Sequence, residues 1–226
     1  MGQCRVRNIT IVKLICAFAW HYPPLDTKSV IAYSISRTDI GPARSEWKRL
    51  GIPITCPGAY SCNLGLTKTM GLGPALQSVV ANQTDPEIRK LRINASGCPN
   101  SCGQHWVGDF GFYGNARKID GPDGVKHEVP YYQMLLGGTY QEFGVAVQSL
   151  PARLVPVAVE RVLEHFKQNR QEGESFRAYV LRHKVETFRQ LTADLTKPPM
   201  DVPEMFRDWG DDVEYSLKLG RGECAA

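Results

Sequence analysis

The clearest hydrophobic pattern along the chain lies in its last third. Apolar side chains recur there at the three- and four-residue spacing of an amphipathic helix, at Val155, Val159, Val162, Leu163 and Phe166. Pro156 suits the first turn of such a helix, where its missing N–H would have no partner. Beyond Gly173 the sequence ESFRAYVLRHKVETFRQL resumes the same period. The pattern therefore predicts two helices, over residues 154–168 and 175–191.

Runs rich in β-branched and aromatic residues predict strands upstream of these helices. Two strands are predicted, HEVPYYQMLLGG (127–138) and YQEFGVAVQSL (140–150). The first ends at Gly137–Gly138 and the second at Ser149. RVRNITIVKLIC (5–16) predicts a further strand, and RSEWKRL (44–50) a helical turn. The glycine-rich stretches around the cysteines are expected to be loops.

Changes in composition divide the chain into three parts. Residues 1–50 are interrupted by two prolines in HYPPLDTKS and predict an irregular lead-in. Residues 51–191 hold the predicted sheet, the cysteine loops and both helices. Residues 192–226 are rich in proline and acidic residues, and we expect a surface tail pinned by Phe206 and Trp209.

Charge and hydropathy exclude two classes of partner. The net charge is only +4, from 27 basic and 23 acidic residues, and no Lys/Arg run suggests nucleic-acid binding. No stretch of eighteen apolar residues predicts a membrane span. The N-terminal apolar run is interrupted by Lys13 and lacks a small-residue cleavage site, so a signal peptide is not expected. We therefore expect a cytoplasmic protein.

Cysteine spacing carries the candidate chemistry. The chain has seven cysteines, an odd number, and clustered thiols in a reducing compartment indicate metal binding or catalysis more often than disulfides. Four of them form a C-x5-C pair, Cys56 and Cys62, and a C-x3-C pair, Cys98 and Cys102. Four thiolates from two loops suit a cubane [4Fe-4S] cluster. Structural zinc, which prefers narrower pairs, and unrelated buried thiols remain open at this point.

The flanks of these pairs resemble a known family. CPGAYSC, followed by INASGCPNSCGQHWVGDFGFYG, is similar to the assimilatory nitrite and sulfite reductase hemoproteins, and YYQMLLGGTYQEFGVAVQSLPARLVP and GESFRAYVLRHK extend the resemblance to about residue 191. The resemblance implies an α+β fold, with helices packed on a mixed sheet and the cysteine loops at one end. Residues 1–50 would then be a remnant of a ferredoxin-like domain.

The resemblance also implies cofactors and their ligands. Members hold siroheme beside a [4Fe-4S] cluster, so Cys56, Cys62, Cys98 and Cys102 are the expected cluster ligands. Cys102, the last of the four, would bridge the cluster to the siroheme iron. Six-electron reduction of sulfite to sulfide, or of nitrite to ammonia, is the implied reaction. Ferredoxin or a similar protein is the implied electron donor.

Five further residues near the motif are weaker candidates. Asn100 could orient a cysteine sulfur or contact the macrocycle, and Gln104 and His105 could reach siroheme carboxylates. His105 could equally be a hydrogen-bonded loop histidine. Arg92 and Arg153 are candidates for siroheme carboxylates, because guanidinium pairs with carboxylate through two hydrogen bonds.

The resemblance covers only the second half of the family's architecture. The cationic residues that grip the anion lie in the first half, so no catalytic residue is assigned here, and a companion chain could supply that half. We therefore predict that the isolated chain has little or no reductase activity. Two alternatives stay open: a cluster-only superfamily member of the cobalamin-pathway type, and a non-catalytic zinc- or cluster-binding module.

Overall fold

The computed structural model describes residues 53–81, 83–121 and 124–217. The chain divides into two compact units, Met1–Trp47 and Lys48–Ala226. The first unit lies outside the described residues, and so do the strand predicted over 5–16 and the helical turn predicted over 44–50. No helix within the described ranges is long and apolar enough to cross a membrane.

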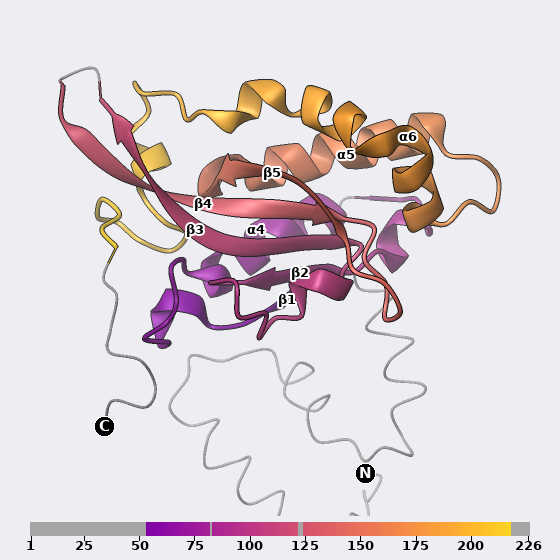
Figure 1. Ribbon diagram of the computed structural model, residues 1–226, viewed down its shortest axis with the longest axis horizontal. Helices are drawn as coiled ribbons and strands as arrows, with labels where there is room; N and C mark the ends of the chain where they lie inside the picture. The colour runs from indigo at the N-terminus through magenta and orange to yellow at the C-terminus, as the bar shows by residue number, and fades with distance from the viewer. Residues whose placement is uncertain (1–52, 82, 122–123, 218–226) are drawn as a thin grey trace, which may run out of the picture. The chain divides into compact units, whose positions relative to one another are not determined.

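A five-stranded mixed sheet forms the centre of the fold (Figure 1). Its strands lie side by side in chain order: β1 (Ile54–Thr55), β2 (Ile93–Ser96), β3 (Phe110–Asp120), β4 (Lys126–Leu136) and β5 (Val145–Pro151). β1, β2 and β3 run parallel, whereas β4 and β5 pair antiparallel with the strand before each. Parallel neighbours need long crossover connections, and the two crossovers of this sheet contain the two cysteine pairs.

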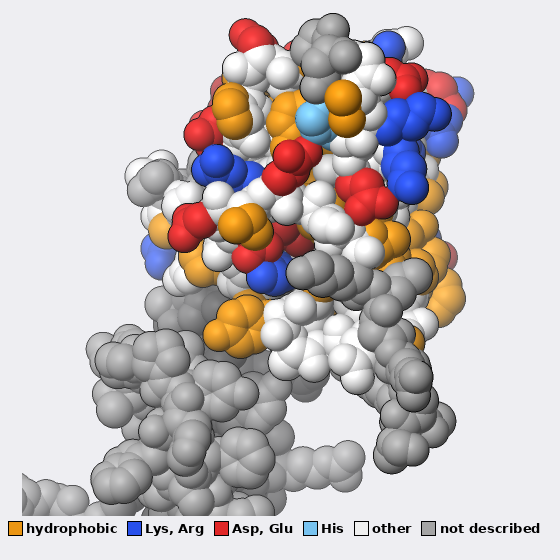
Figure 2. Space-filling model, turned by 90° about the vertical axis from the view of Figure 1, so that its left-hand side faces the viewer, with side chains coloured by type: hydrophobic (Ala, Val, Ile, Leu, Met, Phe, Trp, Pro, Cys, Tyr) orange, Lys and Arg blue, Asp and Glu red, His pale blue; other side chains and the backbone are white. Residues whose placement is uncertain are grey.

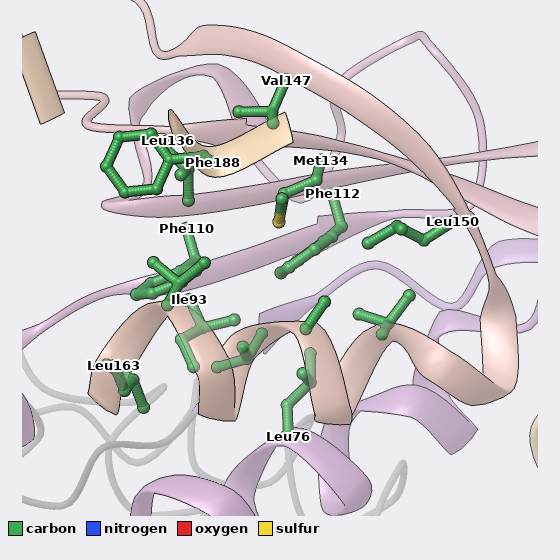
Figure 3. Packing of buried hydrophobic residues seen from close by; sticks show 14 of the residues in the cluster. Leu76, Ile93, Phe110, Phe112, Met134, Leu136, Val147, Leu150, Leu163 and Phe188 are labelled. Carbon is green, nitrogen blue, oxygen red and sulfur yellow. The ribbon is translucent and has the colours of Figure 1, made fainter. Parts of the chain in front are cut away.

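Three helices pack with the sheet around one hydrophobic core. They are α4 (Thr69–Ala81), α5 (Val155–Asn169) and α6 (Phe176–Leu191). Figure 3 shows Phe110 and Phe112 of β3 pointing toward the helices, with Leu76 of α4 and Leu163 of α5 facing them. All four side chains are at most 1% exposed. This apolar packing fixes the orientation of the sheet and therefore of the loops at its ends.

Several sequence predictions are confirmed by these elements. The mixed sheet with packed helices is the predicted fold class. Helices α5 and α6 begin and end within one residue of the predicted 154–168 and 175–191, and β4 overlaps the strand predicted over 127–138. The second helix is not continuous, however, because its backbone is kinked at Lys184.

One prediction was wrong at its start, and three elements were missed. The strand predicted over 140–150 begins only at Val145, because residues 139–142 form a turn in which the Thr139 hydroxyl accepts hydrogen bonds from the Gln141 and Glu142 amides. The four cysteines lie in loops as expected, but α4 and β2 between the two pairs, and β3 after the second pair, were not predicted. Glycines in α4 and β3, and Pro74 in α4, conceal the hydrophobic period, and β2 is only four residues long.

The C-terminal segment contacts the body of the molecule through specific side chains. Phe206 belongs to a small cluster with Val129 and Tyr131, the alternate β4 residues that do not face the helices. Trp209 Nε1 donates to the carbonyl of Ala152 at 2.8 Å. The two aromatic residues expected to pin the tail therefore both contact the sheet domain.

Candidate functional site

The two cysteine pairs follow two neighbouring parallel strands. Cys56 comes directly after β1, and Cys98 comes two residues after the end of β2. The Cys56 amide still donates to Ala95 of β2 at 3.1 Å, which continues the pairing beyond Thr55. Because the strands are parallel, their carboxyl ends lie at the same edge of the sheet. The fold thereby brings two pairs 35 residues apart to one place.

The four thiols differ in exposure and influence one another. Cys98 is buried, Cys56 and Cys62 are half-buried, and Cys102 is exposed. Burial raises the pKa of the Cys98 thiol, and the charges of the other three cysteines raise it further, while a hydrogen bond from the Asn100 backbone lowers it. A bound cation would offset the free-energy cost of ionising the Cys98 thiol, because iron and zinc both bind cysteine as the thiolate.

A short segment between the pairs, residues 65–69, touches both of them; we call it the bridging loop. The amides of Leu66 and Thr67 both donate to the carbonyl of Gly97, at 2.8 and 3.0 Å. The Thr69 hydroxyl donates to the carbonyl of Cys56 at 2.6 Å and lies 3.5 Å from its sulfur. The bridging loop therefore ties the backbone of one cysteine loop to that of the other.

The sulfur of Cys56 also accepts a direct hydrogen bond. The Gly97 N–H donates to Cys56 Sγ over an N···S distance of 3.1 Å. Glycine is required here by space: a Cβ at Gly97 would lie 2.5 Å from Gly58 Cα and 2.6 Å from the Thr67 carbonyl oxygen. Hydrogen bonds to ligand sulfurs are among the factors that set the potential of an iron–sulfur cluster. The close approach of the Gly97 backbone to Cys56 would therefore influence the potential of a bound cluster.

His105 lies inside the protein beneath the second cysteine loop. It is 0% exposed, and its Nδ1 lies 2.9 Å from Ser96 Oγ, which accepts a hydrogen bond from the Gly103 amide. Burial lowers the pKa of His105 to about 4, so the imidazole is neutral near pH 7. The Nδ1 contact suits a loop histidine, whereas the buried Nε2 has no partner among the described residues, so a role toward siroheme stays a prediction. Gln104 beside it is exposed with a left-handed backbone (φ 55°).

Both candidate arginines bind groups of the protein. Arg92 Nε pairs with Asp109 at 3.0 Å, and a second nitrogen of its guanidinium donates to the carbonyl of Gly138. Arg153 donates to two carbonyl oxygens of the tail, including that of Asp208 at 2.8 Å, and its guanidinium lies over the Trp209 ring. These internal contacts occupy part of each guanidinium, and contact of either arginine with a siroheme carboxylate stays a prediction.

The chemistry of the donor set, four cysteine thiols on two loops, suits an iron–sulfur cluster. Four thiolates around one zinc, each at about 2.3 Å, would lie roughly 3.8 Å apart. Among the residues that the structure describes, no three His, Cys, Asp or Glu side chains could hold one metal ion together. A cubane takes one thiolate at each of four irons, which needs wider spacing. For siroheme, the described residues offer the exposed Cys102 thiol.

Sequence reasoning missed the residues that support the cysteines. Thr67 and Thr69 are both 0% exposed, although nothing in the sequence around them signals a buried role. Asp208 is 1% exposed and accepts the Lys68 amide at 2.7 Å across 140 residues of sequence. Only the folded arrangement brings these groups together.

Comparison with known proteins gives the family. A sequence model described as the nitrite and sulphite reductase 4Fe-4S domain matches residues 46–198, more than half of the chain. The chain belongs to this family. Membership implies a [4Fe-4S] cluster and siroheme as cofactors.

Individual relatives are named as nitrite or sulfite reductases. A ferredoxin–nitrite reductase of Leptolyngbya laminosa is 34% identical over 115 residues, which is 50% of this chain and 22% of the relative. A sulfite reductase [ferredoxin] of Mycolicibacterium paratuberculosis is 31% identical over 147 residues, which is 61% of this chain and 25% of the relative. The solved Mycobacterium tuberculosis NirA protein has 26% identity and a TM-score of 0.49, covering 63% of this chain and 27% of that one. This chain spans about a quarter of the length of these relatives.

Proposed function

We propose that the chain is the cluster-binding part of a siroheme-dependent nitrite or sulfite reductase. In this proposal Cys56, Cys62, Cys98 and Cys102 hold the [4Fe-4S] cluster. The observation that carries it is the position of both pairs at the carboxyl ends of adjacent parallel strands, with the Cys98 thiol within electrostatic range of the other three. The match of the family over residues 46–198 supports the same conclusion.

The differing exposure of the cysteines supports a division of roles. Cys98 is the buried member of the set, as suits a ligand that faces the cluster alone. Cys102 is the exposed member of the set, so its sulfur can also reach a group outside this domain. We assign to it the bridge to siroheme iron, and to Asn100 and Gln104 contacts around that bridge.

The cofactors would supply the electron-transfer chemistry, and the chain supplies their surroundings. The bound cluster and siroheme would carry electrons to sulfite or nitrite, six for each anion reduced. The chain fixes the sulfur of Cys56 through the Gly97 N–H and keeps His105 neutral and hydrogen-bonded to Ser96. It thereby holds two cysteine loops in a fixed relation, so that little rearrangement accompanies each electron.

Activity of the whole enzyme needs more than the described residues. The relatives are named as ferredoxin-dependent reductases, and we infer a ferredoxin-type donor, a cytoplasmic location and a further polypeptide segment or companion chain that supplies the anion site. An anion that is protonated through successive reductions needs several cationic donors. We therefore expect the isolated chain to turn over sulfite and nitrite negligibly. Robust turnover by the isolated chain would refute this part of the proposal.

Replacement of Cys98 by serine tests the ligand assignment. We expect the Cys98→Ser chain, reconstituted without oxygen, to lose most of its iron and acid-labile sulfide, because serine is a poor cluster ligand. Cys224→Ser is the matched control, since Cys224 lies outside both pairs. Full iron and an unchanged absorption spectrum in Cys98→Ser would refute the assignment.

A further inference from the structure

The C-terminal segment beyond the family match reaches back to the cysteine loops. The match ends at residue 198, whereas the contacts to the bridging loop come from residues 206–215, which we call the tail clamp. Asp208 Oδ2 accepts the Lys68 amide at 2.7 Å, and the Tyr215 hydroxyl donates to the Leu66 carbonyl at 2.7 Å. The tail clamp therefore holds the bridging loop at two points.

Asp208 is itself firmly placed by the rest of the protein. Its second carboxylate oxygen accepts the Trp209 amide at 2.7 Å, and its own carbonyl accepts a hydrogen bond from Arg153 at 2.8 Å. A Cβ at Gly71 would lie 2.4 Å from the Trp209 carbonyl oxygen, so α4 and the tail clamp are in direct backbone contact. Burial raises the pKa of Asp208 to about 6 in spite of the two amide donors. A buried carboxyl with this set of contacts has a positional role.

The contact between loop and tail clamp depends on these few polar interactions. A cavity of about 260 Å³ opens between them, lined by Lys68, Asp208, Asp211 and Tyr215 among others. Lys68 also pairs with Asp211 at 2.5 Å, but both side chains are partly exposed there. Acidic and basic side chains lie next to one another on the side of the molecule shown in Figure 2. Without the Asp208 carboxylate, the Tyr215–Leu66 hydrogen bond and the partly exposed Lys68–Asp211 ion pair would remain to hold the bridging loop.

We propose that Asp208 is a positioning residue that fixes the cluster environment by anchoring the bridging loop through the Lys68 amide. The anchored amide lies between Thr67, whose amide binds the Gly97 carbonyl, and Thr69, whose hydroxyl binds the Cys56 carbonyl. Gly97 in turn donates to the sulfur of Cys56. The effect of Asp208 thus passes through the loop to a predicted cluster ligand. This inference rests on the proposed function, because it requires the cysteines to hold the cluster.

A double-mutant cycle on the full chain separates this role from a simple charge effect. The variants are Asp208→Ala, Thr69→Val and the double variant, each reconstituted anaerobically with iron and sulfide. Two properties are measured: the rate of iron release to a chelator, and the electron paramagnetic resonance spectrum of the reduced cluster. Asp211→Ala is the matched control, because it removes a carboxylate from the same cavity and leaves the Lys68 amide anchor intact.

We expect Asp208→Ala to release iron about tenfold faster than the unmodified chain and to alter the cluster spectrum, with Asp211→Ala changing the rate less than about twofold. In the Thr69→Val background, Asp208→Ala should add less than about twofold, because both changes interrupt one path. Equal effects in both backgrounds would overturn the proposal, since a through-space charge acts independently of Thr69. Equal effects of Asp208→Ala and Asp211→Ala would also overturn it.

Two further observations keep the test decisive. Hydrogen exchange of the cluster-free chain should show faster exchange at residues 66–67 in Asp208→Ala, with α5 protected as before; unchanged exchange at 66–67 would overturn the proposal. An unmodified chain that takes up no iron and sulfide under any reconstitution condition would refute the proposed function, and the role of Asp208 with it. A stable cluster with an additive cycle would refute only the role of Asp208.

Discussion

The helix-covered part of the sheet and its cysteine end are held together by different interactions. In the first, Phe110, Phe112 and Met134 contact α4, α5 and α6 in an apolar core that excludes water. In the second, glycines allow backbone to touch backbone, and hydrogen bonds from Thr67, Thr69 and the tail clamp fix the loops. The free energy of apolar burial depends little on how the buried groups are oriented, whereas hydrogen bonds and close backbone contacts at glycine require a defined geometry.

The core and the cysteine end have different roles, one in folding and the other in binding the proposed cluster. The core provides most of the free energy of folding, because burial of apolar area is the dominant favourable contribution. The cysteine end exposes the Cys102 thiol and directs the Gly97 N–H at the sulfur of Cys56. Changes in the core should therefore alter global stability, and changes at the cysteine end should alter cluster content first.

The largest expected effect on stability is in the core. Phe112→Ala removes a fully buried ring and should lower the free energy of unfolding by about 4 kcal/mol. Val157→Ala on α5 is the control; its side chain is 38% exposed, so the loss should stay within about 0.5 kcal/mol. Urea denaturation followed by circular dichroism measures both. Similar losses in the two variants would contradict this account of the core.

The next largest effect is expected at Gly97. Gly97→Ala places a Cβ against the backbone of Gly58 and Thr67, which should cost about 3 kcal/mol and displace the donor to Cys56 Sγ. Gly173→Ala, with φ +71° and open space around it, should cost only about 1 kcal/mol. Cluster content at a temperature where both variants keep their helices should fall in Gly97→Ala alone. Equal cluster content in both variants would count against the role of this close contact.

A pH effect of intermediate size is expected from His105. Its pKa in the folded state, about 4, lies below the ordinary value of 6.5, so the unfolded chain binds the proton more readily. The contribution of His105 to the free energy of unfolding is therefore fully present above pH 6.5 and is lost as the pH falls toward 4. At pH 5 the loss should be about 2 kcal/mol.

The variant His105→Asn isolates this contribution. Asparagine retains a polar atom near the position of Nδ1, which contacts Ser96, but does not titrate. The change in unfolding free energy between pH 7 and pH 5 should be about 2 kcal/mol smaller in His105→Asn than in the unmodified chain. An identical pH dependence in the two chains would show that His105 is solvated or already protonated.

How much the sequence could predict differs between the same two regions. The spacing of Val155, Val159 and Phe166 predicts α5 to within one residue, because a face that packs on a core must repeat with the helix. Helix α4 has no comparable signal, since Gly71, Gly73 and Pro74 lower its helix propensity. Gly71 is instead required by its close contact with the Trp209 backbone, and a Cβ at Gly73 would lie only 3.2 Å from the Thr55 methyl group.

The candidate site shows the same limit. The four cysteines are evident from their spacing, because thiols are rare and their pairs are regular. Thr69 and Asp208 carry no such signal, since their roles depend on contacts to residues 13 and 140 positions away. The internal partners of Arg92 and Arg153 were likewise hidden, because a sequence does not show which carbonyl groups a guanidinium will reach.

The smallest expected effect concerns a strained position in the helical region. Lys184 in α6 has φ 61° and ψ 160°, a conformation that side chains with a Cβ strongly disfavour. Lys184→Gly should raise the free energy of unfolding by about 1 kcal/mol, whereas Lys184→Ala retains the Cβ and should not. Thermal denaturation of both variants distinguishes them. A gain in Lys184→Ala equal to that in Lys184→Gly would mean that backbone strain is not the cause.

The most direct test of the central claim is a metal count on the anaerobically purified and reconstituted chain. Iron, acid-labile sulfide and zinc are measured on one sample together with its absorption spectrum. The proposed cluster predicts four irons and four sulfides for each chain and a broad band in the blue part of the visible spectrum. A colourless chain with one tightly bound zinc and no labile sulfide would contradict it.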